Sequence, residues 1–101
     1  SYGAYIQDTI FTPLGLTSMR SDYENADINH FATGYTRLNT SRTRLPIEHV
    51  KANALAAATG LTSNARDICT FFSSLVIGKD ILLSDASKRE MQHAESDAFE
   101  V

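Results

Sequence analysis

The chain has 101 residues, of which 43% are hydrophobic and 21% charged, and its formal net charge is -3. This is the balance of an ordinary globular domain. It excludes intrinsic disorder, collagen-like repeats and the strongly basic surface of a nucleic-acid-binding protein. The single cysteine, Cys69, excludes an internal disulfide framework and a multi-cysteine zinc site. No stretch approaches the roughly 18 consecutive apolar residues of a membrane span.

The first residues predict a short amphipathic helix over 2–11, because apolar side chains recur there at helical spacing: Tyr2, Tyr5, Ile6 and Ile10. We expect Pro13 and Gly15 to end this helix, since proline biases Thr12 away from the helical conformation. The first five residues lack the basic and apolar regions of a signal peptide and resemble the middle of a helix. We therefore expect residues 1–101 to be one fragment of a longer protein.

Residues 17–52 show no sustained periodicity and predict a long loop with short strands near 30–36 and 44–47 and a turn at 39–41. A loop of this length is often functional or wrapped on something larger. Its charges fall into an acidic group and a basic group, namely Asp22, Glu24 and Asp27, then Arg37, Arg42, Arg44 and Lys51. We interpret the basic group as a solvated loop that balances the acidic tail, in preference to an anion-binding site.

The second half is more regular. The run of small residues at 54–58 leads to a special backbone position at Gly60. Asn64 then caps a helix over 65–77, with Asp67 supporting the cap, and Gly78 ends it. Its predicted buried face is Ala65, Ile68, Cys69, Phe72, Leu75 and Val76.

Ser84 caps a last helix over 85–93, anchored by the apolar side chain of Met91. Residues 94–101 form an acidic tail that we expect to fray. The predicted fold is thus mainly α, with three helices and a long loop containing short strands.

No constellation of catalytic or metal-binding residues stands out. The three histidines, His30, His49 and His93, fit no zinc spacing and are interpreted as surface residues, and Cys69 as a buried, inert thiol. No cofactor motif and no S-x-x-K tetrad occurs. The Y-x-N triplet at residues 23–25 lies in an irregular acidic segment, where neighbouring carboxylates would raise the pKa of a tyrosine, so we do not assign it a catalytic role.

Four segments in order do resemble a known family. These are residues 1–19, ending in the PLGLTSM sequence, the A-T-G-Y sequence at 32–35, the AATGLTSNARDI sequence at 57–68, and Leu82-Leu83-Ser84 with Met91. They are similar to the helix and "PLGM" segment, the "A-x-G-Y" strand, the "AAGGLxSTAxDL" segment and the "LLS…M" segment of class C β-lactamase-like serine hydrolases. That superfamily includes penicillin-binding DD-peptidases and related esterases. Thr59 stands where the family usually has glycine, and Asn64 where it has Thr or Ser.

The resemblance implies that the chain is a helical-subdomain segment of the serine β-lactamase-like (α+β) fold. In that family S-x-x-K and Y-x-N precede this stretch and K-T-G or H-x-G follows it, so the triplet at 23–25 lies on the wrong side to carry the catalytic tyrosine. The segment would therefore provide scaffold and one wall of the substrate cleft, at Ala58, Thr59 and Gly60, with no catalytic, cofactor-binding or metal-binding residue of its own. Its partners would be the remainder of the parent hydrolase and, in that parent, a β-lactam or D-Ala-D-Ala-like substrate.

Nucleic acid and a membrane span are not expected. The family is often exported, which is consistent with a periplasmic or extracellular parent, but the sequence leaves the compartment open. It also leaves open whether the parent is a β-lactamase, a peptidase or an esterase. The alternative interpretation is a free-standing helical protein-interaction module, in which the basic loop or the acidic tail docks a partner.

Overall fold

The computed structural model describes residues 1–22, 28–37 and 42–93. Three segments of the sequence analysis lie outside these residues: the Y-x-N triplet at 23–25, the predicted turn at 39–41 and the acidic tail at 94–101. The helices are α1 (Tyr2–Ile6), α2 (Thr12–Leu14), α3 (Ala56–Thr59), α4 (Ala65–Ser74) and α5 (Asp85–Gln92), with a π-helical turn η1 (Gln7–Phe11) and two 3-10 turns, η2 (Ile28–His30) and η3 (Asn53–Leu55). The strands are β1 (Arg20–Ser21), β2 (Gly34–Thr36), β3 (Leu45–Ile47) and β4 (Leu61–Thr62).

The N-terminal helix is longer than predicted. α1, η1 and α2 follow one another without a break, and Thr12 keeps helical dihedral angles of -63° and -48°. Pro13 lies at the start of α2, directly after the π-helical turn. The helix ends at Gly15, whose φ of +69° is the left-handed conformation that favours glycine.

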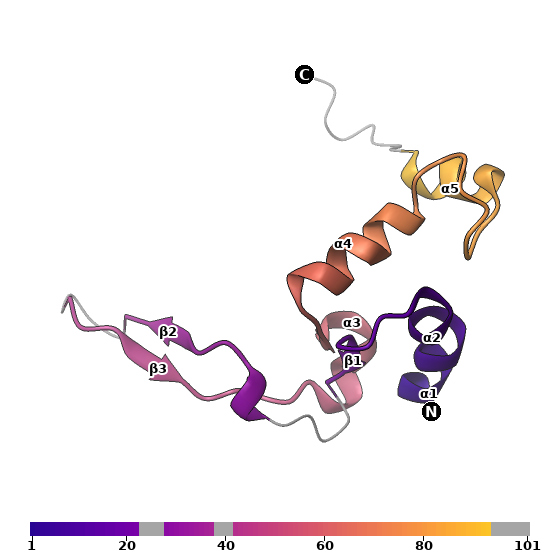
Figure 1. Cartoon of the computed structure of the whole chain (residues 1–101). Coiled ribbons are helices and arrows are strands. Elements are labelled where there is room, and N and C mark those ends of the chain that lie inside the picture. The colour runs from indigo at the N-terminus through magenta and orange to yellow at the C-terminus, as the bar shows by residue number, and fades with distance from the viewer. Residues whose placement is uncertain (23–27, 38–41, 94–101) are drawn as a thin grey trace.

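Two small antiparallel pairs form from the segment predicted as a loop. β1 pairs with β4, and β2 pairs with β3, with Tyr35 opposite Pro46. The short strands predicted near 30–36 and 44–47 are confirmed at 34–36 and 45–47, and the structure pairs them as a hairpin. This hairpin projects away from the helices (Figure 1).

Helix α4 begins as predicted, because Asn64 accepts a 2.8 Å hydrogen bond from the Asp67 N–H. The predicted buried face is wrong: the residues that α4 buries most are Asp67, Phe71 and Ser74, while Cys69 and Phe72 are exposed. The Asp67 carboxylate faces inward and accepts a 2.7 Å hydrogen bond from the Ser18 N–H, while the Asp67 N–H is the donor to the Asn64 cap. The helix also ends earlier than predicted, at Ser74, and Gly78 takes φ +94° in the turn beyond it.

Helix α5 is capped by Ser84 as predicted, the Ser87 N–H donating to its hydroxyl. Met91 is not its anchor, since it is 58% exposed, whereas Lys88 is fully buried. The Lys88 ammonium donates to the backbone carbonyls of Val76 and Lys79, which lie beyond the end of α4. The residue that anchors α5 is therefore Lys88, whose buried ammonium donates hydrogen bonds to backbone carbonyls.

The core is small. One cluster of buried apolar side chains, Ile6, Phe11, Leu16 and Met19, joins the N-terminal helices to the turn before β1, and Phe71 of α4 packs against it. Several large apolar side chains remain exposed elsewhere, including Tyr5, Val50, Leu55 and Phe72. No helix in the described ranges is long and apolar enough to cross a membrane.

Candidate functional site

The three predicted wall residues lie together at the end of α3. Ala58 and Thr59 are exposed and Gly60 is buried, at the turn that leads into β4. Residues 56–61 line a shallow depression of about 270 Å³ on this surface. The turn thus presents small side chains and backbone beside an open hollow.

Gly60 is required here by close packing and not by its backbone angles. Its φ is -113°, which any residue can adopt. A Cβ at this position would lie 2.5 Å from the Ala52 Cβ and 2.7 Å from the Ala56 Cα. The predicted special position is therefore a contact between two backbone segments that only glycine permits.

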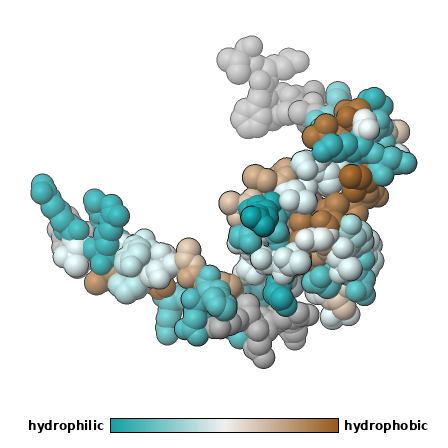
Figure 2. Space-filling model, in the orientation of Figure 1, coloured by the Kyte–Doolittle hydropathy of each residue, from teal (hydrophilic) through white to brown (hydrophobic). Residues whose placement is uncertain are grey.

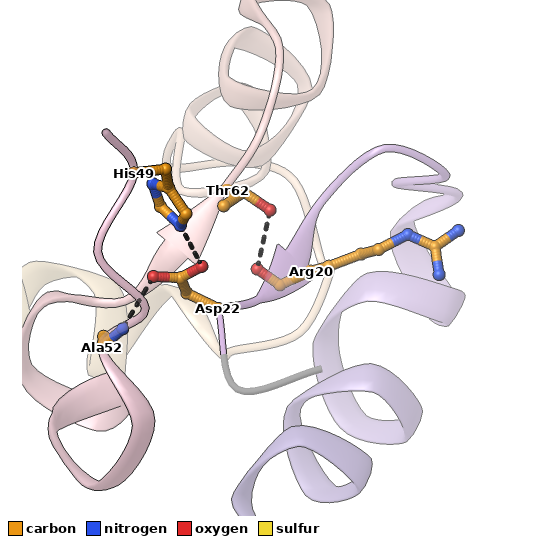
Figure 3. A network of polar contacts seen from close by, with 5 residues as sticks. All are labelled: Arg20, Asp22, His49, Ala52 and Thr62. Carbon is orange, nitrogen blue, oxygen red and sulfur yellow. Dashed lines mark hydrogen bonds and ion pairs between the residues drawn. The ribbon is translucent and has the colours of Figure 1, made fainter. Parts of the chain in front are cut away.

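Asp22 connects this turn to residues 49–52 through its backbone and its buried carboxylate. The Asp22 N–H donates to the Gly60 carbonyl over 2.8 Å, and the Asp22 side chain is directed away from that bond toward residues 49–52 (Figure 3). Its Oδ2 accepts the Ala52 N–H at 2.9 Å, and its Oδ1 accepts His49 Nε2–H at 2.8 Å. In the same network the Thr62 hydroxyl donates to the Arg20 carbonyl across β1 and β4.

The surroundings of Asp22 favour its ionised form. Burial alone would raise the pKa of this carboxyl. The hydrogen bonds from Ala52 and His49, with the positive charges of His49 and Lys51, outweigh burial and hold the pKa below its ordinary value of 3.8. The carboxylate is a fixed negative charge at neutral pH.

His49 completes the network from the solvent side. As predicted, His30, His49 and His93 are all exposed residues. The His49 ring nevertheless packs edge-on against Phe31, with ring centroids 4.9 Å apart. Asp22 and His49 are 27 residues apart, and no local pattern in the sequence indicated that they meet.

The prediction that Asp22 belongs to an acidic group of the loop is corrected: its side chain is buried, with 6% exposure, and it binds His49 and Ala52. The other two members, Glu24 and Asp27, lie outside the described residues. Among the described residues no three His, Cys, Asp or Glu side chains are placed to hold a metal ion. The contact between Asp22 and His49 can hold residues 49–52 in place.

An apolar cavity of about 320 Å³ lies beside the small core, and Ile6, Phe11 and Met19 belong to both. Its lining also includes Ile68, Phe71 and Phe72 of α4. A hydrophobic surface is visible between α4 and the N-terminal helices in Figure 2. This cavity is open, and its lining continues onto the exposed face of α4.

The sequence model of one family, described as beta-lactamase, matches residues 1–100. The comparisons with curated proteins and with solved structures gave no match.

Proposed function

The chain belongs to the beta-lactamase family, and from this premise we propose that it is a non-catalytic helical segment of a serine hydrolase. In this proposal the segment supplies scaffold and one wall of the substrate cleft. The observation that carries the proposal is the family match over residues 1–100 of a sequence that contains no S-x-x-K tetrad. The serine nucleophile and the lysine that activates it would come from other parts of the parent.

The exposed apolar faces support a scaffold role. Phe72 is 62% exposed on α4, and the cavity beside it is almost wholly apolar. Contiguous exposed apolar surface usually marks a region that packs on another structure. The remainder of the hydrolase domain is the partner that fits this surface.

The turn at Ala58, Thr59 and Gly60 is our candidate for the cleft wall. Its small side chains let a substrate approach the backbone, and the Asp22 N–H fixes the Gly60 carbonyl from behind. In the parent, a serine would attack the carbonyl of a β-lactam or a D-Ala-D-Ala-like peptide and form an acyl-enzyme. The wall would position that carbonyl without taking part in bond making.

The proposal is tested by incubating the isolated chain with a penicillin and measuring its intact mass. We expect no adduct, because acylation requires an activated serine. A penicillin-binding protein in the same buffer serves as the positive control. Stoichiometric addition of one penicillin to the 101-residue chain would contradict the proposal.

A second measurement addresses the parent directly. Sequencing the gene on both sides of this stretch should reveal S-x-x-K and Y-x-N upstream and K-T-G or H-x-G downstream. Flanking sequence without these motifs would remove the hydrolase assignment even if the penicillin experiment gave no adduct.

A further inference from the structure

The projecting hairpin differs in charge from the rest of the chain. We call its described residues, 31–37 and 42–47, the basic arm. The whole stretch 31–47 contains three of the nine Lys and Arg residues and none of the twelve Asp and Glu residues, so the remainder has six basic and twelve acidic residues. Arg37, Arg42 and Arg44 are exposed, and hydrophilic side chains cover the far end of the hairpin in Figure 2.

The arm also has an incomplete sheet. Within the described residues β2 and β3 pair only with each other, and a two-stranded hairpin is at best marginally stable in water. Apolar side chains are exposed on both of its faces: Tyr35 is 60% exposed on one, and Ile47 is 55% exposed on the other. β3 contains Pro46, which has no N–H, so β2 is the strand whose outer edge keeps all its donors.

The base of the arm is fixed. Phe31 precedes β2 and contacts the His49 ring, and His49 follows β3 and donates to the buried Asp22. The Ala52 N–H binds the same carboxylate. These contacts join the outgoing and returning segments to each other and to Asp22, directly after β1, so the base of the arm is attached to the body of the molecule.

We propose that the basic arm docks an acidic polypeptide segment in extended conformation, which adds to the outer edge of β2 as a third strand. Backbone hydrogen bonds to β2 would hold the segment, and its carboxylates would pair with Arg37, Arg42 and Arg44. A short acidic segment meets only the arm. Nucleic acid or an anionic bilayer would also face the remainder of the chain, whose net charge is negative, and would be repelled. This interaction goes beyond the proposed hydrolase role.

The test measures binding of a fluorescent peptide of about ten residues that alternates Glu with Val and Thr. We expect the triple variant R37Q/R42Q/R44Q to bind at least about tenfold more weakly, and added salt to weaken binding to the unaltered chain. The matched control is R66Q/K79Q/R89Q, which removes three exposed charges outside the arm and should bind like the unaltered chain. Circular dichroism of both variants confirms that they are folded.

Further probes separate this partner from others. The same peptide with alternate backbone amides methylated should lose binding, because it cannot pair with a strand edge. Two other probes are tested separately: vesicles that contain phosphatidylserine, and a single-stranded oligonucleotide. Each should bind the chain no more tightly than the peptide does. No peptide binding, equal loss in the two triple variants, unchanged binding of the methylated peptide, or tighter binding of vesicles or oligonucleotide would each overturn the proposal.

Discussion

At the scale of single residues, Asp22 connects the most parts of the molecule. Its backbone N–H binds the Gly60 carbonyl, while its carboxylate binds the Ala52 N–H and His49. A buried carboxylate that accepts two hydrogen bonds is stabilised in its charged form. The native state therefore releases this proton more readily than the unfolded chain does.

The lowered pKa of Asp22 gives a pH dependence of definite sign. Its contribution to stability is fully present above the ordinary value of 3.8 and is lost as pH falls through the lower native pKa. Asp22→Asn should therefore be less stable than the unaltered chain at about pH 6 and show a smaller loss of stability on acidification. Urea midpoints measured from about pH 6 down to pH 2 would show this. Parallel pH profiles for the two proteins would contradict it, and Asp8→Asn, at an exposed position, is the control.

Hydrogen bonds between residues close in sequence were predictable. Asn64 and Ser84 cap their helices through the third following N–H, a local pattern that the sequence shows directly. Asp22 and His49 were not predictable, because the contact depends on how residues 22–52 return to the body of the molecule. Cys69 was placed wrongly because helical spacing identifies an apolar face without saying whether the described chain covers it.

At the scale of elements, α5 supplies donors to the turn that follows α4. This turn, residues 75–79, lies beyond the helix end at Ser74. Gln92 binds the Leu75 carbonyl at 2.8 Å, and Lys88 binds the carbonyls of Val76 and Lys79. The Asp85 carboxylate accepts the Gly78 N–H at 3.0 Å, which fixes the turn between the two helices.

Lys88→Ala should therefore loosen α5 and the turn before it. The substitution leaves two carbonyls without their charged donor, which costs about 2 kcal/mol, or about a 30-fold increase in opening. Amide hydrogen exchange within α5 and at Gly78 would measure this loss of protection. Lys79→Ala removes an exposed side chain and keeps the carbonyl, so it should change exchange little. Equal effects of the two substitutions would show that the Lys88 ammonium is not the anchor.

The helices were easier to predict than the strands. Caps and periodicity place α4 and α5 to within a few residues. The π-helical turn η1, which joins α1 to α2 and lies just before Pro13, has no comparable cap or periodicity in the sequence. β1 and β4 have two residues each and pair across 40 to 42 positions, so no short window of the sequence predicts them.

At the scale of the whole molecule, the chain exposes more surface than a compact protein of its mass. Its accessible surface is 8309 Å², against about 5,700 Å² for a compact monomer of this mass. Its radius of gyration is 17.6 Å, against about 13 Å for a compact domain of this length. Only five apolar side chains are buried among the described residues.

This open shape predicts concentration-dependent association and a broad thermal transition for the isolated chain. Phe72→Ser should reduce association, because Phe72 is exposed on α4 and lines the apolar cavity. Sedimentation over a range of concentrations would measure the change. Thr70→Ser alters an exposed polar residue of the same helix and is the control. A monodisperse chain that melts cooperatively would instead favour the free-standing interaction module.

The packing around Gly60 has a consequence for how this sequence can vary. Ala52, Ala56 and Gly60 meet so closely that a single added methyl at position 60 overlaps atoms of both alanines. A side chain at position 60 is therefore admissible only if the backbone segments separate. In an alignment of relatives, position 60 should remain glycine wherever these two segments keep the same separation.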